Sequence, residues 1–148
     1  MRCLFLLFFA WILGCGGQKN INDPSSAAKG PMTVIYQGPL SPGSMSPIQS
    51  LWEVGDVGKG VTPGAVQFTL RLTLENDQIK TVVVSKMEAM CEPFPKSRSL
   101  PGPITVDTTF LDGRHTHETD PAKPDIWQGF QHAKALKELC QQAGIPFG

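Results

Sequence analysis

A chain of 148 residues is long enough for one ordinary domain and hardly for two. Its 13 Lys and Arg residues balance 13 Asp and Glu residues, so the chain lacks the basic surface that nucleic acid attracts. We therefore expect no nucleic-acid partner. The hydrophobic fraction of 41% is ordinary for a globular protein, and the many Gly and Pro residues indicate long ordered loops.

The first fifteen residues carry the most specific pattern in the chain. A single basic residue, Arg2, precedes an apolar run over residues 3–13, which is shorter than the roughly 20 residues that a membrane-spanning helix needs. The sequence at residues 12–15, Ile-Leu-Gly-Cys, resembles the lipobox of bacterial lipoproteins. The resemblance implies that residues 1–14 are a cleaved signal peptide and that Cys15 receives a lipid.

The same resemblance implies a location in the cell envelope. In lipoproteins, Gly16 in place of an Asp after the lipidated cysteine favours the outer membrane, so the protein would face the periplasm or the cell surface. Residues 16–32 are small and polar, and as a flexible coil they would reach about 20–25 Å. We therefore expect residues 15–32 to tether a single globular domain, residues 33–148, to the membrane through the lipid.

The clearest predicted element of that domain is a β-hairpin over residues 65–87. Apolar and polar residues alternate strictly over residues 66–75, which indicates a strand with one buried face. Residues 76–77 tolerate the backbone of a two-residue turn, and this turn would place Leu74 opposite Ile79.

Shorter strands are predicted on both sides of this hairpin. Residues 33–37 are β-branched and aromatic, which favours a first strand, and residues 104–111 alternate as a strand does. The Pro- and Gly-rich residues 37–64 are expected to form a long loop with one short strand around residues 50–54. Residues 112–125 are expected to form a polar loop.

A single amphipathic helix is predicted to close the chain. Apolar residues recur at helical spacing over residues 126–143, Asp125 suits the N-cap, and Gly144 suits a left-handed C-cap. Strands followed by one helix indicate an α+β fold, a small and mostly antiparallel sheet with the hairpin at its centre and the helix packed on it. A β-sandwich with a terminal helix is the alternative.

The four cysteines divide into three roles. Cys3 would be lost with the signal peptide, and Cys15 would carry the lipid. In an exported protein the remaining two, Cys91 and Cys140, are expected to form a disulfide. The alternative is a pair of buried free thiols.

Two features of the mature chain are candidates for binding. His115 and His117, together with the carboxylates of residues 112–120, offer nitrogen and oxygen ligands for a divalent metal, although a solvated loop explains so polar a run equally well. Trp127 is the aromatic residue we retain as a binding candidate. The other aromatic candidates, expected mostly in the core, are Tyr36, Trp52 and Phe94.

The sequence shows none of the common catalytic motifs. It has no Gly-x-Ser-x-Gly elbow, no His-Glu-x-x-His and no phosphate-binding Gly-x-x-x-x-Gly-Lys, so we expect no enzyme and no cofactor. We predict an envelope-anchored lipoprotein whose domain binds or stabilises an envelope protein or a cell-wall component. The alternative is a metal-binding periplasmic protein that uses residues 112–120.

Overall fold

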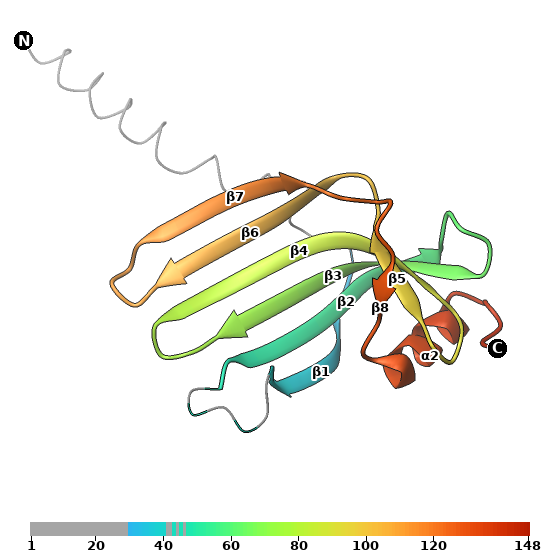
Figure 1. Cartoon of the computed structure of the whole chain (residues 1–148), viewed down its shortest axis with the longest axis horizontal. Coiled ribbons are helices and arrows are strands. Elements are labelled where there is room, and N and C mark those ends of the chain that lie inside the picture. The colour runs from blue at the N-terminus through green and yellow to red at the C-terminus, as the bar shows by residue number, and fades with distance from the viewer. Residues whose placement is uncertain (1–29, 41–42, 44, 46) are drawn as a thin grey trace, which may run out of the picture.

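The computed structural model describes residues 30–40, 43, 45 and 47–148 (Figure 1). The predicted signal peptide, Cys15 and most of the predicted tether lie outside these residues. The described residues form eight strands and one helix. In chain order these are β1 (Thr33–Pro39), β2 (Gln49–Lys59), β3 (Ala65–Glu75), β4 (Ile79–Met90), β5 (Lys96–Ser99), β6 (Pro103–Phe110), β7 (His115–Pro121), β8 (Gln128–Gly129) and α2 (Ala133–Gln142).

The strands form one antiparallel sheet that forks at β4. β3 pairs with one edge of β4 from Lys80 to Met90. On the other edge, residues 79–84 pair with β6 and residues 87–89 pair with β5. β6 continues to β7, β5 continues to β8, and β1 and β2 extend the sheet on the side of β3 (Figure 1). The predicted α+β class is confirmed, and the described strands do not form the alternative sandwich.

The central hairpin is present, but the predicted register is wrong. Leu74 pairs with Thr81 and not with Ile79. The side chain of Asn76 accepts hydrogen bonds from the backbone N–H groups of Gln78 and Ile79, at 2.9 and 3.0 Å, and its own N–H donates to the carbonyl of Ile79 at 3.0 Å. Asn76 therefore precedes the turn, because its side chain caps the turn instead of lying within it.

Two predicted loops contain strands. The predicted loop over residues 37–64 contains the 11-residue β2, in which the pairing shifts between Gly55 and Gly58 and Asp56 adopts a φ of 52°. The register shift is that of a β-bulge, which glycines inside a strand often mark. The predicted polar loop over residues 112–125 contains β7, whose seven residues are all exposed, so it lacks the alternation of buried and exposed residues that identifies a strand.

The closing helix begins later than the predicted Ile126. Its N-cap is His132 and not Asp125. The intervening segment joins the sheet instead, because β8 pairs with β5 and the N–H of Phe130 donates to the carbonyl of Pro95 at 2.9 Å. Phe130 is buried there, so tertiary contacts override the helical periodicity. No helix in the described part of the chain is long and apolar enough to cross a membrane.

The predicted C-cap is confirmed. Gly144 has a φ of 71°, the N–H of Gly144 donates to the carbonyl of Gln141 at 3.1 Å, and the N–H of Ile145 donates to the carbonyl of Cys140 at 2.9 Å. These two bonds form a Schellman motif, and Ile145 packs against the core.

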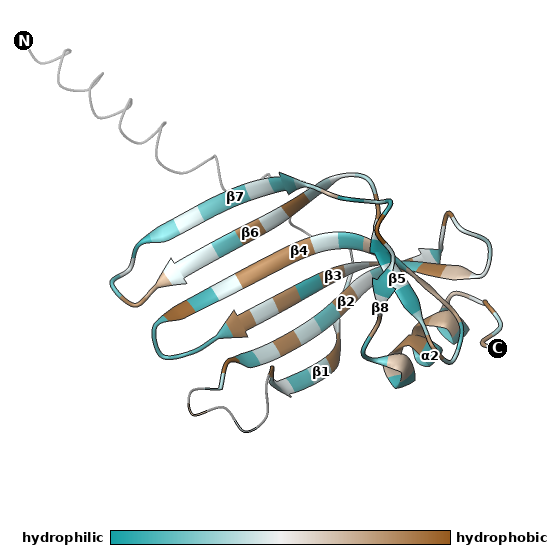
Figure 2. Ribbon diagram, in the orientation of Figure 1, coloured by the Kyte–Doolittle hydropathy of each residue, from teal (hydrophilic) through white to brown (hydrophobic). Residues whose placement is uncertain are grey.

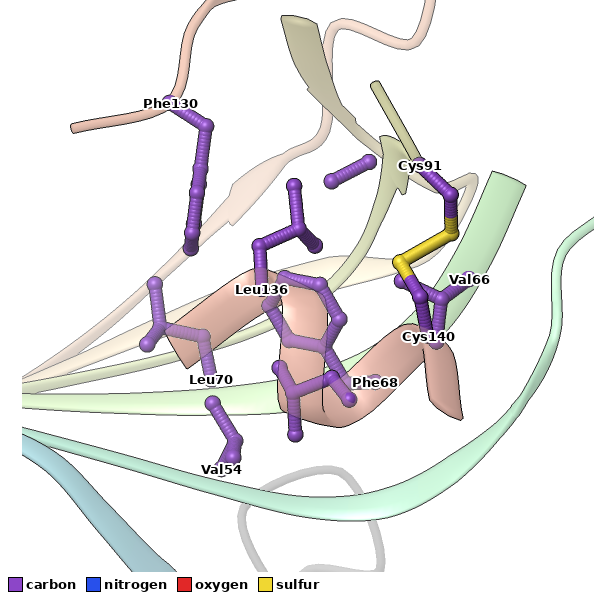
Figure 3. Close-up of a cluster of buried hydrophobic side chains, with 10 residues drawn as sticks. Val54, Val66, Phe68, Leu70, Cys91, Phe130, Leu136 and Cys140 are labelled. Carbon is purple, nitrogen blue, oxygen red and sulfur yellow. A yellow bond between two sulfur atoms is a disulfide. The ribbon is translucent and has the colours of Figure 1, made fainter. Parts of the chain in front are cut away.

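The core lies between α2 and one half of the sheet (Figure 3). A 10-residue helix is about 15 Å long, whereas an 11-residue strand is about 36 Å long, so α2 covers only part of β3. Beyond the helix, Leu72 and Leu74 remain partly exposed, and Figure 2 shows hydrophobic residues continuing along β3 and β4 there. The buried cluster comprises Val54, Val66, Phe68, Leu70, Ala89, Cys91, Phe130, Leu136, Leu139 and Cys140.

Phe94 is not a core residue, contrary to expectation. It lies between Pro93 and Pro95 in the loop that follows β4, and 90% of its surface is exposed.

A disulfide joins the helix to the sheet. The sulfur atoms of Cys91, which directly follows β4, and Cys140, in α2, are 2.11 Å apart, and both residues are buried (Figure 3). This is the pairing that the sequence predicts. Gly148 also contacts the disulfide-bonded Cys91, because its backbone N–H donates to the carbonyl of Cys91 at 3.1 Å.

Removing the disulfide should destabilise the domain strongly. The two cysteines are 49 residues apart, and closing a loop of that length contributes about 4 kcal/mol in the chain-entropy description. We expect the double variant Cys91→Ala, Cys140→Ala to lose about that much free energy of unfolding, measured by urea denaturation. Alkylation of the unfolded, unreduced protein followed by mass spectrometry provides the control. Two alkylated thiols in the wild type would contradict the prediction.

Candidate functional site

A groove of about 490 Å³ lies beside the fork in the sheet. Its walls come from β4, β5, the start of β6, the end of β7, β8 and the segment between β7 and β8. The lining combines apolar, uncharged polar and charged side chains, which suits a ligand with several functional groups. The lining residues are Met87, Ser97, Arg98, Ser99, Ile104, Asp120, Pro121, Lys123, Ile126 and Gln128.

Arg98 is the most constrained side chain of this groove. Its Nε donates to Oε1 of Glu88 at 2.6 Å, and its two terminal nitrogens donate to the carbonyl of Pro124 and to Oγ1 of Thr62, both at 3.2 Å. The guanidinium carbon also lies 4.7 Å from the centre of the Trp127 ring, a cation–π contact. One guanidinium group thus ties β5 to β4, to the β2–β3 connection and to the segment before β8.

The partner of Arg98 is a carboxylate with no exposed surface. Oε2 of Glu88 accepts hydrogen bonds from the backbone N–H groups of Val61 and Thr62, at 3.0 and 3.1 Å, and Oε1 accepts from the hydroxyl of Thr62 at 2.7 Å. Burial raises the pKa of Glu88, but the hydrogen bonds from Thr62 and Arg98 outweigh it and hold the pKa below its ordinary value. The backbone of Gly60 lies close to the Glu88 carboxylate, since a Cβ on Gly60 would lie 2.8 Å from Oε2 of Glu88.

Trp127, the predicted binding candidate, contacts Arg98 but is not among the residues that line the groove. It precedes β8 and is not in the first turn of the helix. The ring is half-buried against Arg98, so it fixes the guanidinium from one side.

The two predicted metal-ligating histidines lie on β7. Nδ1 of His117 is 2.6 Å and Nε2 of His115 is 3.5 Å from the same oxygen of Asp107, on β6. The carboxylates of Glu118 and Asp120 do not join them, because each alternates with the histidines along the strand and points to the other face.

A third predicted oxygen ligand, Asp112, pairs with Arg114 at 2.6 Å instead. Among the residues described, no group of three or more His, Cys, Asp or Glu side chains is arranged to hold a metal ion. The structure thus brings the two histidines to Asp107 and separates them from the carboxylates predicted to complete the site.

His132, the N-cap residue of α2, lies in an aromatic cluster. Its ring stacks on Tyr36 at 4.8 Å and meets the edges of Trp52 and Phe130 at 4.6 and 6.0 Å between ring centres. Burial lowers the pKa of His132 and so favours the neutral ring. The cluster therefore joins the start of α2 to β1 and β2.

No protein-family model matches the chain, and no curated protein or solved structure matches it either.

The buried carboxylate should make stability depend on pH. The folded-state pKa of Glu88 is lowered. The carboxylate therefore contributes its full share to the free energy of unfolding above the unfolded-state pKa of about 4.3, and this share is lost as the pH falls through the folded-state pKa. We expect Glu88→Gln to lower the free energy of unfolding at pH 7 by about 3 kcal/mol and to weaken the loss of stability in acid. Thermal unfolding followed by circular dichroism between about pH 3 and 7 measures both.

Glu75→Gln is the matched control. Glu75 is exposed and lies 3.8 Å from Lys80, and such surface pairs contribute about 0–1 kcal/mol. Equal effects of the two substitutions would contradict the role assigned to Glu88.

Proposed function

We propose that the protein is an exported lipoprotein, anchored through a lipid on Cys15, whose domain binds another component of the bacterial cell envelope. The pairing of Cys91 with Cys140 is the observation that carries the proposal, because stable disulfides are typical of oxidising compartments outside the cytoplasm. The lipobox-like residues 12–15 supply both the route to such a compartment and the anchor.

The groove beside Arg98 is the surface we assign to the partner. It is open to solvent, and it presents a fixed guanidinium group, the ionisable side chains of Asp120 and Lys123, and the half-exposed Ile126. A rigid polar group beside an apolar contact is typical of a recognition site. A protein segment or a cell-wall component fits this chemistry.

We propose binding and not catalysis for this groove. The charge of Arg98 is neutralised by Glu88, whose oxygens already accept hydrogen bonds from Thr62, so the pair suits a structural role better than proton transfer. We do not propose the metal-binding alternative, because His115 and His117 are separated from the carboxylates predicted to complete their site.

Replacing the predicted lipid acceptor tests the anchor. We expect Cys15→Ser to abolish labelling by a clickable fatty acid and to move the protein from the membrane fraction to the soluble fraction. Cys3→Ser is the matched control, because Cys3 is predicted to leave with the signal peptide, and it should label like the wild type. Equal labelling of wild type and Cys15→Ser would refute the lipoprotein assignment.

Cross-linking in cells tests the groove. A photoreactive amino acid at Ile126, which lines the groove and is 49% exposed, should form a discrete adduct with the partner. The same amino acid at Leu111, which is 74% exposed on the β6–β7 turn, should not form that adduct. We expect Trp127→Ala to weaken the adduct at position 126, because Arg98 loses the ring that holds it. Identical adducts from positions 126 and 111 would argue against the groove.

A further inference from the structure

The ring of His132 is enclosed by aromatic side chains from three parts of the chain. Tyr36 in β1 stacks on it, and Trp52 in β2 and Phe130 before α2 meet it edge-on, with ring centres 4.6–6.0 Å from its own. Nε2 of His132 is buried and has no hydrogen-bond partner among the described residues. A neutral ring can carry its proton on Nδ1, whereas a protonated ring must also carry one on Nε2. The enclosure offers that second proton no acceptor.

The elements around this ring provide little that could stabilise a positive charge. Residues 30–52, which include β1 and the start of β2, are uncharged, and so is β8. The helix-facing residues of β3 are apolar. Glu53, the next residue of β2, lies on the other face of the sheet, where Arg71 donates two hydrogen bonds to it. The first turn of α2 contains Lys134 and no acidic residue, and the exposed Glu138 lies in the following turn.

The place of His132 in the helix also disfavours a positive charge. His132 is the N-cap of α2, and the unpaired N–H groups of a helix give its N-terminus a partial positive charge. Its carbonyl accepts a hydrogen bond of the first turn, from the N–H of Leu136 at 3.0 Å, so the ring and the start of the helix move together. Burial accordingly lowers the pKa of His132. A neutral ring suits this position, and a protonated ring does not.

We propose that His132 is a pH-sensitive contact: the neutral ring holds the N-terminal end of α2 against β1 and β2, and protonation releases it. The disulfide at Cys140 keeps the C-terminal end of α2 attached, so the release is local. A groove of about 590 Å³ already lies between residues 33–35 and this end of the helix, and it would widen toward Tyr36 and Trp52. This inference goes beyond the proposed function and does not depend on the lipid anchor.

The direction of the pKa shift determines the pH range of the release. A histidine in water titrates near pH 6.5, and the enclosed His132 titrates below that value. The contact therefore contributes its full share to stability above about pH 6.5, and this share is lost as the pH falls through the folded-state pKa. Glu88 remains ionised over this range, because its folded-state pKa lies below its ordinary value of about 4.3. The effects of His132 and Glu88 thus occur at different pH.

Amide hydrogen exchange in the full chain tests the release, because two amides report on the two ends of α2. The N–H of Leu136 donates to the carbonyl of His132, and the N–H of Ala143 donates to the carbonyl of Leu139, beside the disulfide, both at 3.0 Å. After correction for intrinsic exchange rates, we expect exchange at Leu136 to accelerate several-fold between about pH 7 and pH 5, and exchange at Ala143 to change much less. Equal acceleration at both amides, or none at Leu136, would overturn the proposal.

Two substitutions assign the response to His132. His132→Phe keeps an aromatic ring that cannot be protonated, so Leu136 should stay protected down to about pH 5. His115→Gln removes a histidine on the exposed strand β7 and is the matched control, so its response should equal that of the wild type. If His132→Phe does not fold, an NMR titration of the wild type decides, because the His132 ring should titrate below about pH 6.5. Accelerated exchange that persists in His132→Phe, or a ring that titrates at or above that value, would disprove the proposal.

Discussion

The charge of Glu88, buried where the sheet forks, is the constraint on which this end of the molecule depends. An ionised carboxylate with no exposed surface is strongly unfavourable unless hydrogen bonds and an opposite charge satisfy it. Those partners come from Thr62 in the β2–β3 connection and Arg98 in β5, so both segments must meet at β4. Arg98 in turn holds Pro124 and Trp127. The groove thus exists because one buried charge determines where its walls lie.

At the same end of the sheet, the disulfide and the C-cap of α2 lie on the face that packs against the helix, opposite the face that carries Glu88. Cys140 lies on the buried side of α2, and its carbonyl accepts the Schellman bond from Ile145. The helix is therefore fixed to the sheet at its C-terminal end by a covalent bond, and at its N-terminal end by the stacking of His132 on Tyr36. These contacts lie at one end of the sheet. Leu72 and Leu74 at the opposite end pack less completely, so we infer that stability is distributed unevenly along β3 and β4.

The sequence predicts the features of this fold that depend on local patterns. Strict alternation identified β3, a left-handed glycine identified the end of α2, and counting cysteines identified the pair at 91 and 140. The features it missed depend on partners distant in the sequence. Glu88 lies 26 residues from Thr62, and Trp127 is separated from Arg98 by more than that. No residue near Arg98 in the sequence indicates that its guanidinium group neutralises the buried carboxylate of Glu88.

The errors at His115 and at the start of α2 have the same origin. The polar composition of residues 112–125 predicts a loop, yet β6 supplies a pairing edge that polar residues can use, so β7 forms there. Likewise β5 attracts the segment around Phe130 away from a helix that its apolar spacing favours. In both cases a free strand edge decides the structure. Among the described strands, β1 also has a free edge, and it lacks the charged residues that β7 carries.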